Sequence, residues 1–344
     1  MRAVKLTGIR QMAMFDLPVP QIKDDKDVLI KMTHVGVCGS DVHYYTTGRI
    51  GSQIVQYPFT VGHECAGIVE KTGTAVTRVK PGDRIAVEPA TACHQCDQCL
   101  AGRPHTCRKL TFLGCPGQVE GCLSDYILMK EESCYPIPEQ MTLEEAALSE
   151  PLSIGLYAVK LSIPMRHARI GILGCGPIGL SVLLPALTQG AEKIYVTDKI
   201  DGRLAVAKKA GASWTGNPLK SDIVDGISSA EPLLLDAVFE CCGEQDAADQ
   251  AVKLLKPGGK LMFIGIPEVE RISFNMDYMR RKEICIQNVR RQNHCVQAAL
   301  DMIAAKECDV NIMTTHRFPL ERTQEAFDLV ESYQDGVVKA MIEI

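Results

Sequence analysis

The glycine-rich turn Gly174-x-Gly176-x-x-Gly179 constrains the fold of this chain more than any other segment. A short apolar run, 169–173, precedes the turn, and an apolar helical stretch, 180–189, follows it. In this strand–turn–helix context the first glycine permits a tight turn, the second admits a pyrophosphate, and the third lets helix and strand pack closely. The spacing predicts a βαβ unit that binds a dinucleotide at the N-terminus of the helix.

An acidic residue follows this turn at the distance expected for ribose recognition. Asp198 ends the next predicted strand, 193–198, where a carboxylate can accept hydrogen bonds from both ribose hydroxyls. The same carboxylate would repel a 2′-phosphate, which favours NAD over NADP. Arg203 could admit a 2′-phosphate, although a helix-surface charge is the simpler interpretation. The predicted cofactor-binding residues are Gly174, Gly176, Pro177, Ile178, Gly179, Asp198 and Arg203.

Strand-like and helix-like stretches alternate regularly after residue 150. Helical spacing over 143–161 is followed by β-like runs that include 235–240, 260–265 and 284–289. Such alternation predicts a doubly wound parallel sheet of the Rossmann type, and hence an α/β fold. The first 150 residues instead show strand periodicity with long loops, which indicates a mostly β unit. We expect the tail, with its final strand over 337–342, to return to that unit.

Length and composition narrow the class of protein. At 344 residues, two domains are expected. The net charge of −5 argues against a nucleic-acid-binding surface, and no apolar run is long enough to span a membrane. Fifteen cysteines without a secretion signal favour metal ligands and reduced thiols, and therefore a cytoplasmic location.

Four of the cysteines have the spacing of a metal site. Cys93-x2-Cys96-x2-Cys99-x7-Cys107 can place four thiolates around one tetrahedral zinc with no open position, which is the mark of a structural site. An iron–sulfur cluster would use four cysteines equally well. Both alternatives predict a metal that stabilises a loop with little hydrophobic core.

A second candidate site lies in the stretch 37–67. It contains the segments Cys38-Gly39-Ser40-Asp41-Val42-His43 and Gly62-His63-Glu64. A thiolate, imidazoles, carboxylates and a hydroxyl are the groups needed to hold a metal and to move a proton beside it. Taken alone, this stretch is suggestive, because buried cysteines and histidines are common in protein cores.

Together these motifs resemble the zinc-dependent medium-chain dehydrogenase/reductase family over essentially the whole chain. Within the family, Cys38 to Tyr45 followed by Gly48-Arg49-Ile50-Gly51 is similar to the polyol branch, the sorbitol and xylitol dehydrogenases. Glu150-Pro151-Leu152-Ser153 and the segment 315–321 are similar to that branch as well. The resemblance implies a GroES-like catalytic domain, 1–152 and 290–344, and a Rossmann NAD-binding domain, 153–289.

The resemblance also implies roles for individual residues. Cys38, His63 and Glu64 would bind a catalytic zinc, and Glu150 would bind it directly or through water. Ser40 and then His43 would pass on the substrate proton, and Asp41 would orient the histidine ligand. The residues expected to line the substrate pocket are Tyr45, Phe112, Arg291 and Gln292. Gln292 replaces a tyrosine of the animal sorbitol enzymes, so recognition of the substrate hydroxyls can differ.

The expected activity is NAD-dependent oxidation of a secondary hydroxyl in a polyol or sugar acid, with two zinc ions per chain. Oxidation of threonine, butanediol or a simple alcohol on the same scaffold is the nearer alternative. A non-catalytic sensor that binds NAD and zinc is the more distant one. The polyol branch further implies a homotetramer or homodimer, joined through the edge of the nucleotide-domain sheet near 260–275.

Overall fold

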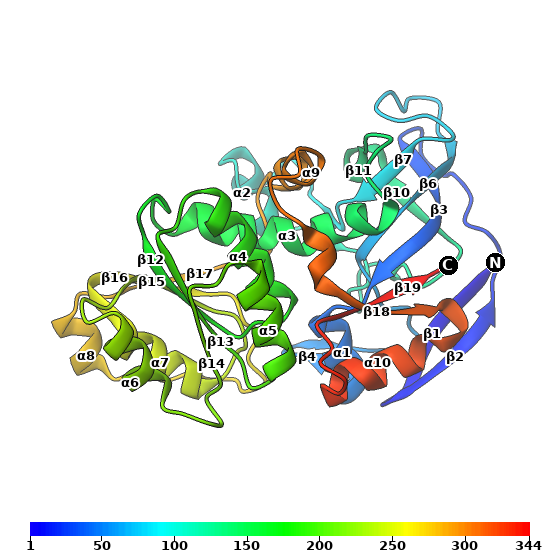
Figure 1. Ribbon diagram of the computed structural model, residues 1–344. Helices are drawn as coiled ribbons and strands as arrows, with labels where there is room; N and C mark the ends of the chain where they lie inside the picture. The colour runs from blue at the N-terminus through cyan, green and yellow to red at the C-terminus, as the bar shows by residue number, and fades with distance from the viewer. The chain divides into compact units, whose positions relative to one another are not determined.

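The computed structural model describes residues 1–344 and consists of two compact units (Figure 1). The first, the catalytic unit, comprises Met1–Glu150, Val296–Lys306 and Thr314–Ile344. The second, the nucleotide unit, comprises Pro151–Cys295 and Glu307–Met313. Helix α3 (Leu143–Leu161) contains the junction between them at residue 150.

The nucleotide unit is built on a six-stranded parallel sheet with the order β14-β13-β12-β15-β16-β17. The strands are β12 (Arg169–Leu173), β13 (Lys193–Thr197), β14 (Trp214–Gly216), β15 (Leu235–Glu240), β16 (Leu255–Phe263) and β17 (Cys285–Asn288). The chain adds the first three strands outward in one direction and the last three in the other. The direction therefore reverses between β12 and β15, and a doubly wound sheet binds its ligand at that switch point.

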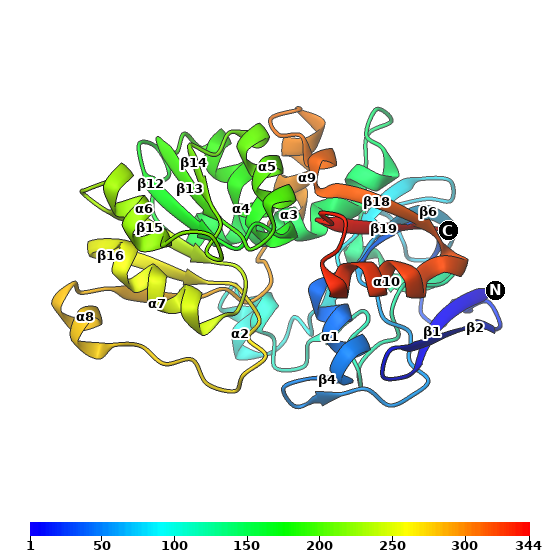
Figure 2. The ribbon, with the colours of Figure 1, turned by 60° about the horizontal axis from the view of Figure 1, so that its bottom comes forward.

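Helices cover both faces of this sheet, with α4 and α5 on one face and α6 and α7 on the other (Figures 1 and 2). The helices are α4 (Pro177–Thr188), α5 (Asp201–Ala210), α6 (Ile223–Ala230), α7 (Gln245–Leu254), α8 (Met276–Arg281) and the 3-10 turn η3 (Val310–Met313). Helix α4 is apolar around most of its circumference, and most of its residues are therefore buried. The predicted Rossmann arrangement is confirmed.

The catalytic unit contains a seven-stranded, largely antiparallel sheet with the order β11-β7-β6-β3-β19-β18, and β10 also pairs with β3. Its strands and helices are β1 (Arg2–Gly8), β2 (Gln11–Asp16), β3 (Asp27–Gly36), α1 (Gly39–Thr47), β4 (Arg49–Ile50), β5 (Gln53–Ile54), β6 (Glu64–Thr72), β7 (Arg84–Val87), β8 (Ala90–Thr91), α2 (Asp97–Leu100), η1 (Pro104–Thr106), β9 (Thr111–Phe112), β10 (Tyr126–Lys130), η2 (Glu131–Ser133), β11 (Cys134–Pro136), α9 (Val296–Ala304), β18 (Thr314–Pro319), η4 (Leu320–Arg322), α10 (Thr323–Ser332) and β19 (Lys339–Glu343).

The C-terminal tail returns to the catalytic unit, as expected. Strand β19 pairs with β3, so that Met341 lies opposite Gly36, and β18 pairs with β19 in parallel. In Figure 1 the red β19 lies beside the blue β3. This pairing brings the last strand of the chain next to the segment that enters α1.

Two parts of the predicted catalytic domain after residue 289 belong elsewhere. Residues 290–295 and 307–313 group with the nucleotide unit. Val310 and Met313 are buried, and the Ser181 hydroxyl of α4 lies 3.6 Å from the Met313 sulfur. Apolar packing on α4 therefore holds the segment 307–313. None of the helices is both long enough and apolar enough to cross a membrane.

Candidate zinc and dinucleotide sites

The glycine turn has the geometry that its spacing predicts. Gly174 follows β12 with a φ of +96°, a conformation that residues with a side chain rarely adopt. A Cβ on Gly179 would collide with the Gly174 carbonyl oxygen, so α4 can pack this closely on the turn only with glycine there. Helix α4 begins at Pro177, and its first N–H groups are free to face an anion.

Asp198 and Arg203 both lie against the glycine turn. One oxygen of the Asp198 carboxylate accepts a hydrogen bond from Cys175 N at 2.7 Å, and the other accepts one from Ile200 N at 2.8 Å. Arg203 is only 7% exposed, and its Nη1 lies 3.5 Å from where a Cβ on Gly176 would be. The expectation of a surface charge at Arg203 is therefore wrong, because this guanidinium lies over the turn. Its charge suits a bound pyrophosphate.

The four cysteines of the 93–107 loop form a compact cluster. Their ligand atoms all lie within 4.8 Å of one another. The sulfur of Cys96 lies 3.6 Å from that of Cys99 and 3.9 Å from that of Cys107. A tetrahedron of thiolates at about 2.3 Å from one zinc has edges of about 3.8 Å. The spacing therefore fits one tetrahedral ion, whereas an iron–sulfur cluster would spread the cysteines around several atoms.

Two thiols of this cluster have pKa values that shift in opposite directions. Hydrogen bonds from the N–H groups of Arg108 and Cys99 lower the pKa of Cys96 to about 6, so this sulfur is readily a thiolate. Burial and the neighbouring sulfurs raise the pKa of Cys99 to about 12. Four thiolates repel one another, and a divalent cation would remove that repulsion.

Cys38 and Ser40 lie at the start of helix α1. Cys38 occupies the N-cap position of the helix. The Ser40 hydroxyl donates a hydrogen bond to the Cys38 sulfur at 3.3 Å. The chain therefore places the predicted zinc ligand Cys38 and the predicted proton carrier Ser40 side by side. His43 follows one turn later on the same helix and is half-buried.

His63 is buried between Asp41 and Phe112. Its Nδ1 lies 3.3 Å from the Asp41 carboxylate, which also accepts a hydrogen bond from Gly62 N at 3.2 Å. Burial opposes protonation of His63, but Asp41 and Cys38 outweigh burial and raise its pKa well above the usual value. The Phe112 ring packs on the imidazole with 5.1 Å between ring centroids. Nδ1 of the ring thus faces Asp41, which leaves Nε2 as the nitrogen that could bind a metal.

Glu64 is paired with a lysine that the sequence pattern did not reveal. Its carboxylate forms an ion pair with Lys339 of β19, and both side chains are buried. Lys339 also donates to the Val37 carbonyl oxygen at 3.2 Å. A Cβ at Gly36, opposite Glu64 in the sheet, would collide with the carboxylate, so the glycine makes room for the pair. The one signal in the sequence was a lone lysine within the apolar run 337–342.

Glu150 interacts electrostatically with His63, Glu64 and Lys339. It is 7% exposed, and burial raises its pKa to about 8, although His63 and Lys339 act in the opposite direction. Glu64 contributes to the raised value. Cys38, His63, Glu64 and Glu150 are thus near enough to interact, but the four cysteines are the only Cys, His, Asp or Glu group whose ligand atoms converge within 4.8 Å.

Tyr45 does not fit the predicted role in substrate binding. It is fully buried, its ring meets Phe327 edge-on at 5.5 Å between centroids, and its hydroxyl donates to Asp328 at 2.6 Å. Tyr45 therefore anchors α1 to α10. Arg291 and Gln292 follow β17 in the nucleotide unit and are half-buried, and Arg291 has a left-handed φ of +54°.

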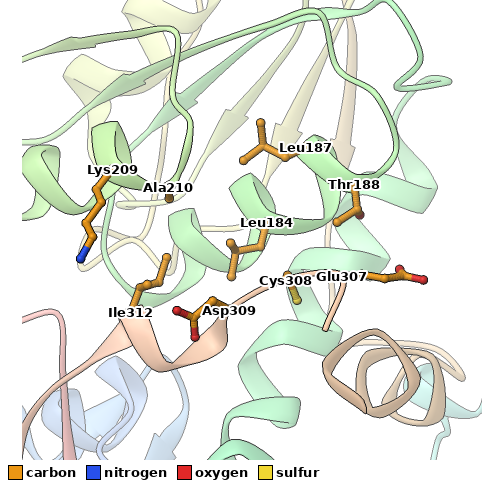
Figure 3. Close-up of a pocket in the computed structure, with 9 residues that line it drawn as sticks. All are labelled: Leu184, Leu187, Thr188, Lys209, Ala210, Glu307, Cys308, Asp309 and Ile312. Atoms are coloured by element: carbon orange, nitrogen blue, oxygen red, sulfur yellow. The ribbon is translucent and has the colours of Figure 1, made fainter. Parts of the chain in front are cut away.

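A hollow of about 520 Å³ in the nucleotide unit is separate from these residues (Figure 3). Leucines of α4 and Ile312 line it together with charged side chains at its margin. None of the predicted site residues lines it. Its lining residues are Leu184, Leu187, Thr188, Lys209, Ala210, Glu307, Cys308, Asp309 and Ile312.

The chain matches two protein families and named relatives over nearly its whole length. Residues 24–139 match the alcohol dehydrogenase GroES-like domain, and residues 177–305 match the zinc-binding dehydrogenase family. Sorbitol dehydrogenase of Bacillus subtilis (strain 168) is 36% identical over 343 residues, which cover 99% of this chain and 97% of that protein. D-xylulose reductase A of Aspergillus oryzae is 32% identical over 336 residues, which cover 95% of this chain and 92% of that protein.

Solved structures share the fold. An oxidoreductase/dehydrogenase of unknown specificity from Escherichia coli has a TM-score of 0.94 and 31% identity, and the match covers 100% of this chain and 99% of that one. A zinc-binding dehydrogenase from Sinorhizobium meliloti bound to NADP has a TM-score of 0.91 and 28% identity, with 100% and 99% covered. The chain therefore belongs to the zinc-dependent medium-chain dehydrogenase/reductase family, in its polyol dehydrogenase branch.

Proposed function

We propose that this protein oxidises a secondary hydroxyl of a polyol or sugar acid to a ketone, with zinc and NAD as its cofactors. The observation that carries the proposal is the group of half-buried Cys38 and Ser40 with buried His63, in which the hydroxyl proposed to carry the proton contacts the sulfur proposed to bind the metal. The names of the relatives, sorbitol dehydrogenase and D-xylulose reductase, support the class of substrate.

Cys38 and His63 are two of the proposed ligands of a catalytic zinc. The third ligand is a carboxylate. We favour Glu150 over Glu64, because the ion pair with Lys339 already neutralises Glu64. The donor set fits zinc, which prefers thiolate, imidazole and carboxylate ligands with one position left open. When bound there, zinc would lower the pKa of a substrate hydroxyl, and the nicotinamide ring would accept the hydride.

The protein's own groups handle the proton and the substrate. In the proposed reaction the Ser40 hydroxyl takes the substrate proton and His43 passes it on toward solvent. Phe112, which packs on His63, would border the substrate carbon. Arg291 and Gln292 remain proposed contacts to the polyol hydroxyls.

NAD is the proposed cofactor, bound at the glycine turn with its ribose at Asp198. Both Asp198 oxygens already accept one backbone hydrogen bond each, and each retains a further lone pair for a ribose hydroxyl. A 2′-phosphate would face this carboxylate at close range. The NADP-bound relative makes NADP the alternative to be tested.

A second, structural zinc is proposed at Cys93, Cys96, Cys99 and Cys107. The sulfur spacings support one tetrahedral ion. All fifteen cysteines of the chain are free of disulfides, which supports a reducing, cytoplasmic location.

The protein is also proposed to form a homodimer or homotetramer through the edge strand β17. This edge of the sheet is unpaired, and exposed apolar side chains lie on the segment that leads to it. They are Ile266, Val269, Met276 and Tyr278. Val269→Asp should lower the mass measured by light scattering, whereas Leu219→Asp, at an exposed leucine that follows β14, should not.

The experiment that tests the function is a substrate screen on protein with measured zinc content. Polyols, sugar acids, threonine, butanediol and simple alcohols are each supplied with NAD or NADP, and formation of the reduced cofactor is followed by absorbance. We expect the highest kcat/KM with a polyol or sugar acid and NAD. Preference for threonine or butanediol would replace the proposed substrate class. No turnover with any alcohol would leave an NAD- and zinc-binding sensor.

A further inference from the structure

Glu240 is a fully buried acid at the carboxyl end of β15. It lies in register with Leu173 of β12 on one side and with Phe263 of β16 on the other. Leu173 directly precedes the glycine turn, so Glu240 stands at the point where the strand order reverses.

Glu240 connects two loops that leave the sheet at this edge. Its carboxylate Oε1 accepts hydrogen bonds from Cys242 N at 2.8 Å and from Gly243 N at 2.6 Å. Its backbone carbonyl accepts hydrogen bonds from Ile264 N at 2.9 Å and Gly265 N at 3.1 Å. One residue thus holds both the loop that follows β15 and the loop that follows β16.

The two loops pack backbone against backbone, which requires glycine in both. A Cβ on Gly243, whose φ is +75°, would lie 2.6 Å from the Ile266 carbonyl oxygen. A Cβ on Gly265 would lie 2.5 Å from the second carboxylate oxygen of Glu240 and would collide with Gly243 N. The Glu240 carboxylate therefore fills the space left by the missing Cβ of Gly265.

That second oxygen, Oε2, is buried and has no hydrogen-bond partner. A buried acceptor without a partner destabilises the folded state, and an apolar side chain would fill the same space without that cost. Stability alone therefore does not explain an acid here. The hydrogen bonds of Oε1 instead fix the path of the 241–243 loop, which touches the glycine turn: a Cβ on Gly174 would lie 3.0 Å from the Cβ of Cys242.

We propose that Glu240 is a positioning residue for the nicotinamide half of the cofactor. The inference rests on the proposed function. Each half of a doubly wound sheet binds one half of a dinucleotide, and the glycine turn and Asp198 belong to the half that binds adenosine. The loops after β15 and β16 border the other half. Glu240 sets their spacing and thereby shapes the nicotinamide pocket without touching the reacting atoms.

The test compares NADH with ADP-ribose, which lacks the nicotinamide ring. Glu240→Ala should weaken NADH binding roughly tenfold or more, because a loop held by two hydrogen bonds from its backbone to the Glu240 side chain is released. Binding of ADP-ribose should change by less than roughly threefold, which is within about 0.7 kcal/mol. Glu240→Gln should recover most of the NADH affinity, because its amide oxygen can accept the same two N–H groups.

Asp236→Asn is the matched control, since Asp236 lies at the amino end of the same strand and accepts a hydrogen bond from Arg169 N at 2.7 Å. It should lower the melting temperature and leave the ratio of the two affinities unchanged. Equal losses of NADH and ADP-ribose binding in Glu240→Ala, or no loss of either, would overturn the assignment.

If Glu240→Ala does not fold, Glu240→Met, whose apolar side chain fills the same space but cannot accept the two N–H groups, decides the question. A loss of NADH affinity in that variant that exceeds its loss of ADP-ribose affinity supports the assignment, and equal affinities overturn it. A wild-type protein that binds no NADH would overturn the proposed cofactor itself. A wild-type protein that binds NADH, with variants that bind it equally well, would overturn the role of Glu240 alone.

Discussion

Lys339 and Glu64 form an ion pair in the interior of the catalytic unit, with side chains that are 0% and 2% exposed. The pair exists because β19, the last strand of the chain, lies against β3, whose neighbour β6 begins with Glu64. Burial lowers the pKa of Lys339, but Glu64 and Cys38 outweigh burial and raise it, so the lysine remains charged. A cation thus lies permanently beside the proposed zinc ligands.

Removal of Lys339 should destabilise the protein strongly. Lys339→Met leaves the Glu64 carboxylate buried without its partner, which typically costs about 3–5 kcal/mol. The double variant with Glu64→Gln should recover most of this loss, because no uncompensated charge remains. Urea unfolding of both variants measures the effect. A double variant as unstable as Lys339→Met alone would mean that the lysine stabilises the fold by packing.

Zinc content should distinguish Glu150 from Glu64 as the direct ligand. We expect Cys38→Ser and Glu150→Gln to retain about one of two zinc ions, since a catalytic site with two protein ligands binds zinc weakly. Glu64→Gln should retain about two, because Lys339 already holds this carboxylate. Glu70→Gln, at an exposed position of the same strand, is the control. Mass-spectrometric metal analysis after dialysis gives the answer, and zinc loss in Glu64→Gln alone would reverse the assignment.

Several elements of the nucleotide unit could be predicted from the sequence, although β16 begins at Leu255 and not at the predicted residue 260. β12 and β15 have the predicted limits, 169–173 and 235–240, because the central positions of a parallel strand are buried on both faces and are mostly apolar. Helix α3 spans 143–161 as its spacing predicts. The turn at Gly174 is recognisable because its glycines are required by the conformation of the backbone.

Long-range contacts of the catalytic unit could not be predicted in the same way. Tyr44 and Tyr45 are both buried, but consecutive helical residues point about 100° apart, and only the position of α10 reveals that Tyr45 is the one that contacts Phe327 and Asp328. The Lys339–Glu64 pair joins residues 275 positions apart. Neither relationship follows from local periodicity, because both depend on how the tail returns to the sheet.

The cysteine loop should lose order without its metal. Cys99→Ser removes one of the four thiolates, so we expect about one zinc fewer per chain and rapid tryptic cleavage after Arg108 and Lys109, since a structural zinc contributes directly to local folding. Cys285→Ser, at an exposed cysteine outside the loop, should change neither property. Iron or inorganic sulfide in the purified protein would contradict the proposed zinc.

Tyr45→Phe should affect stability and leave the kinetics nearly unchanged. The variant removes a hydroxyl that donates to the Asp328 carboxylate at 2.6 Å in the core, and loss of such a bond typically costs about 1–3 kcal/mol. KM for the best polyol should stay within about twofold, because the ring does not reach a pocket. Tyr57→Phe, at an exposed tyrosine of the same unit, is the control for both measurements. A large rise in KM for Tyr45→Phe would restore Tyr45 to the substrate site.

Asp27 should make the stability of the catalytic unit depend on pH in the acid range. Burial raises its pKa, but Lys130 at 2.8 Å and the N–H groups of Lys23 and Asp24 outweigh burial, so the pKa lies below the ordinary 3.8. A lowered pKa means that this carboxylate stabilises the fold fully above pH 3.8 and that the contribution is lost as pH falls through the lower, folded value.

Asp27→Asn should therefore be less stable than wild type by roughly 1–3 kcal/mol at neutral pH, because three hydrogen bonds lose their charged acceptor. The difference in unfolding free energy between the two proteins should shrink as the pH falls below the folded pKa of Asp27, because the wild-type carboxyl is then protonated and uncharged, like the amide of the variant. Asp16→Asn, at an exposed position of β2, is the control. Urea unfolding of both proteins, from neutral pH to the lowest pH at which folding is reversible, measures this difference. A difference that does not change with pH would contradict the proposed effect of Asp27.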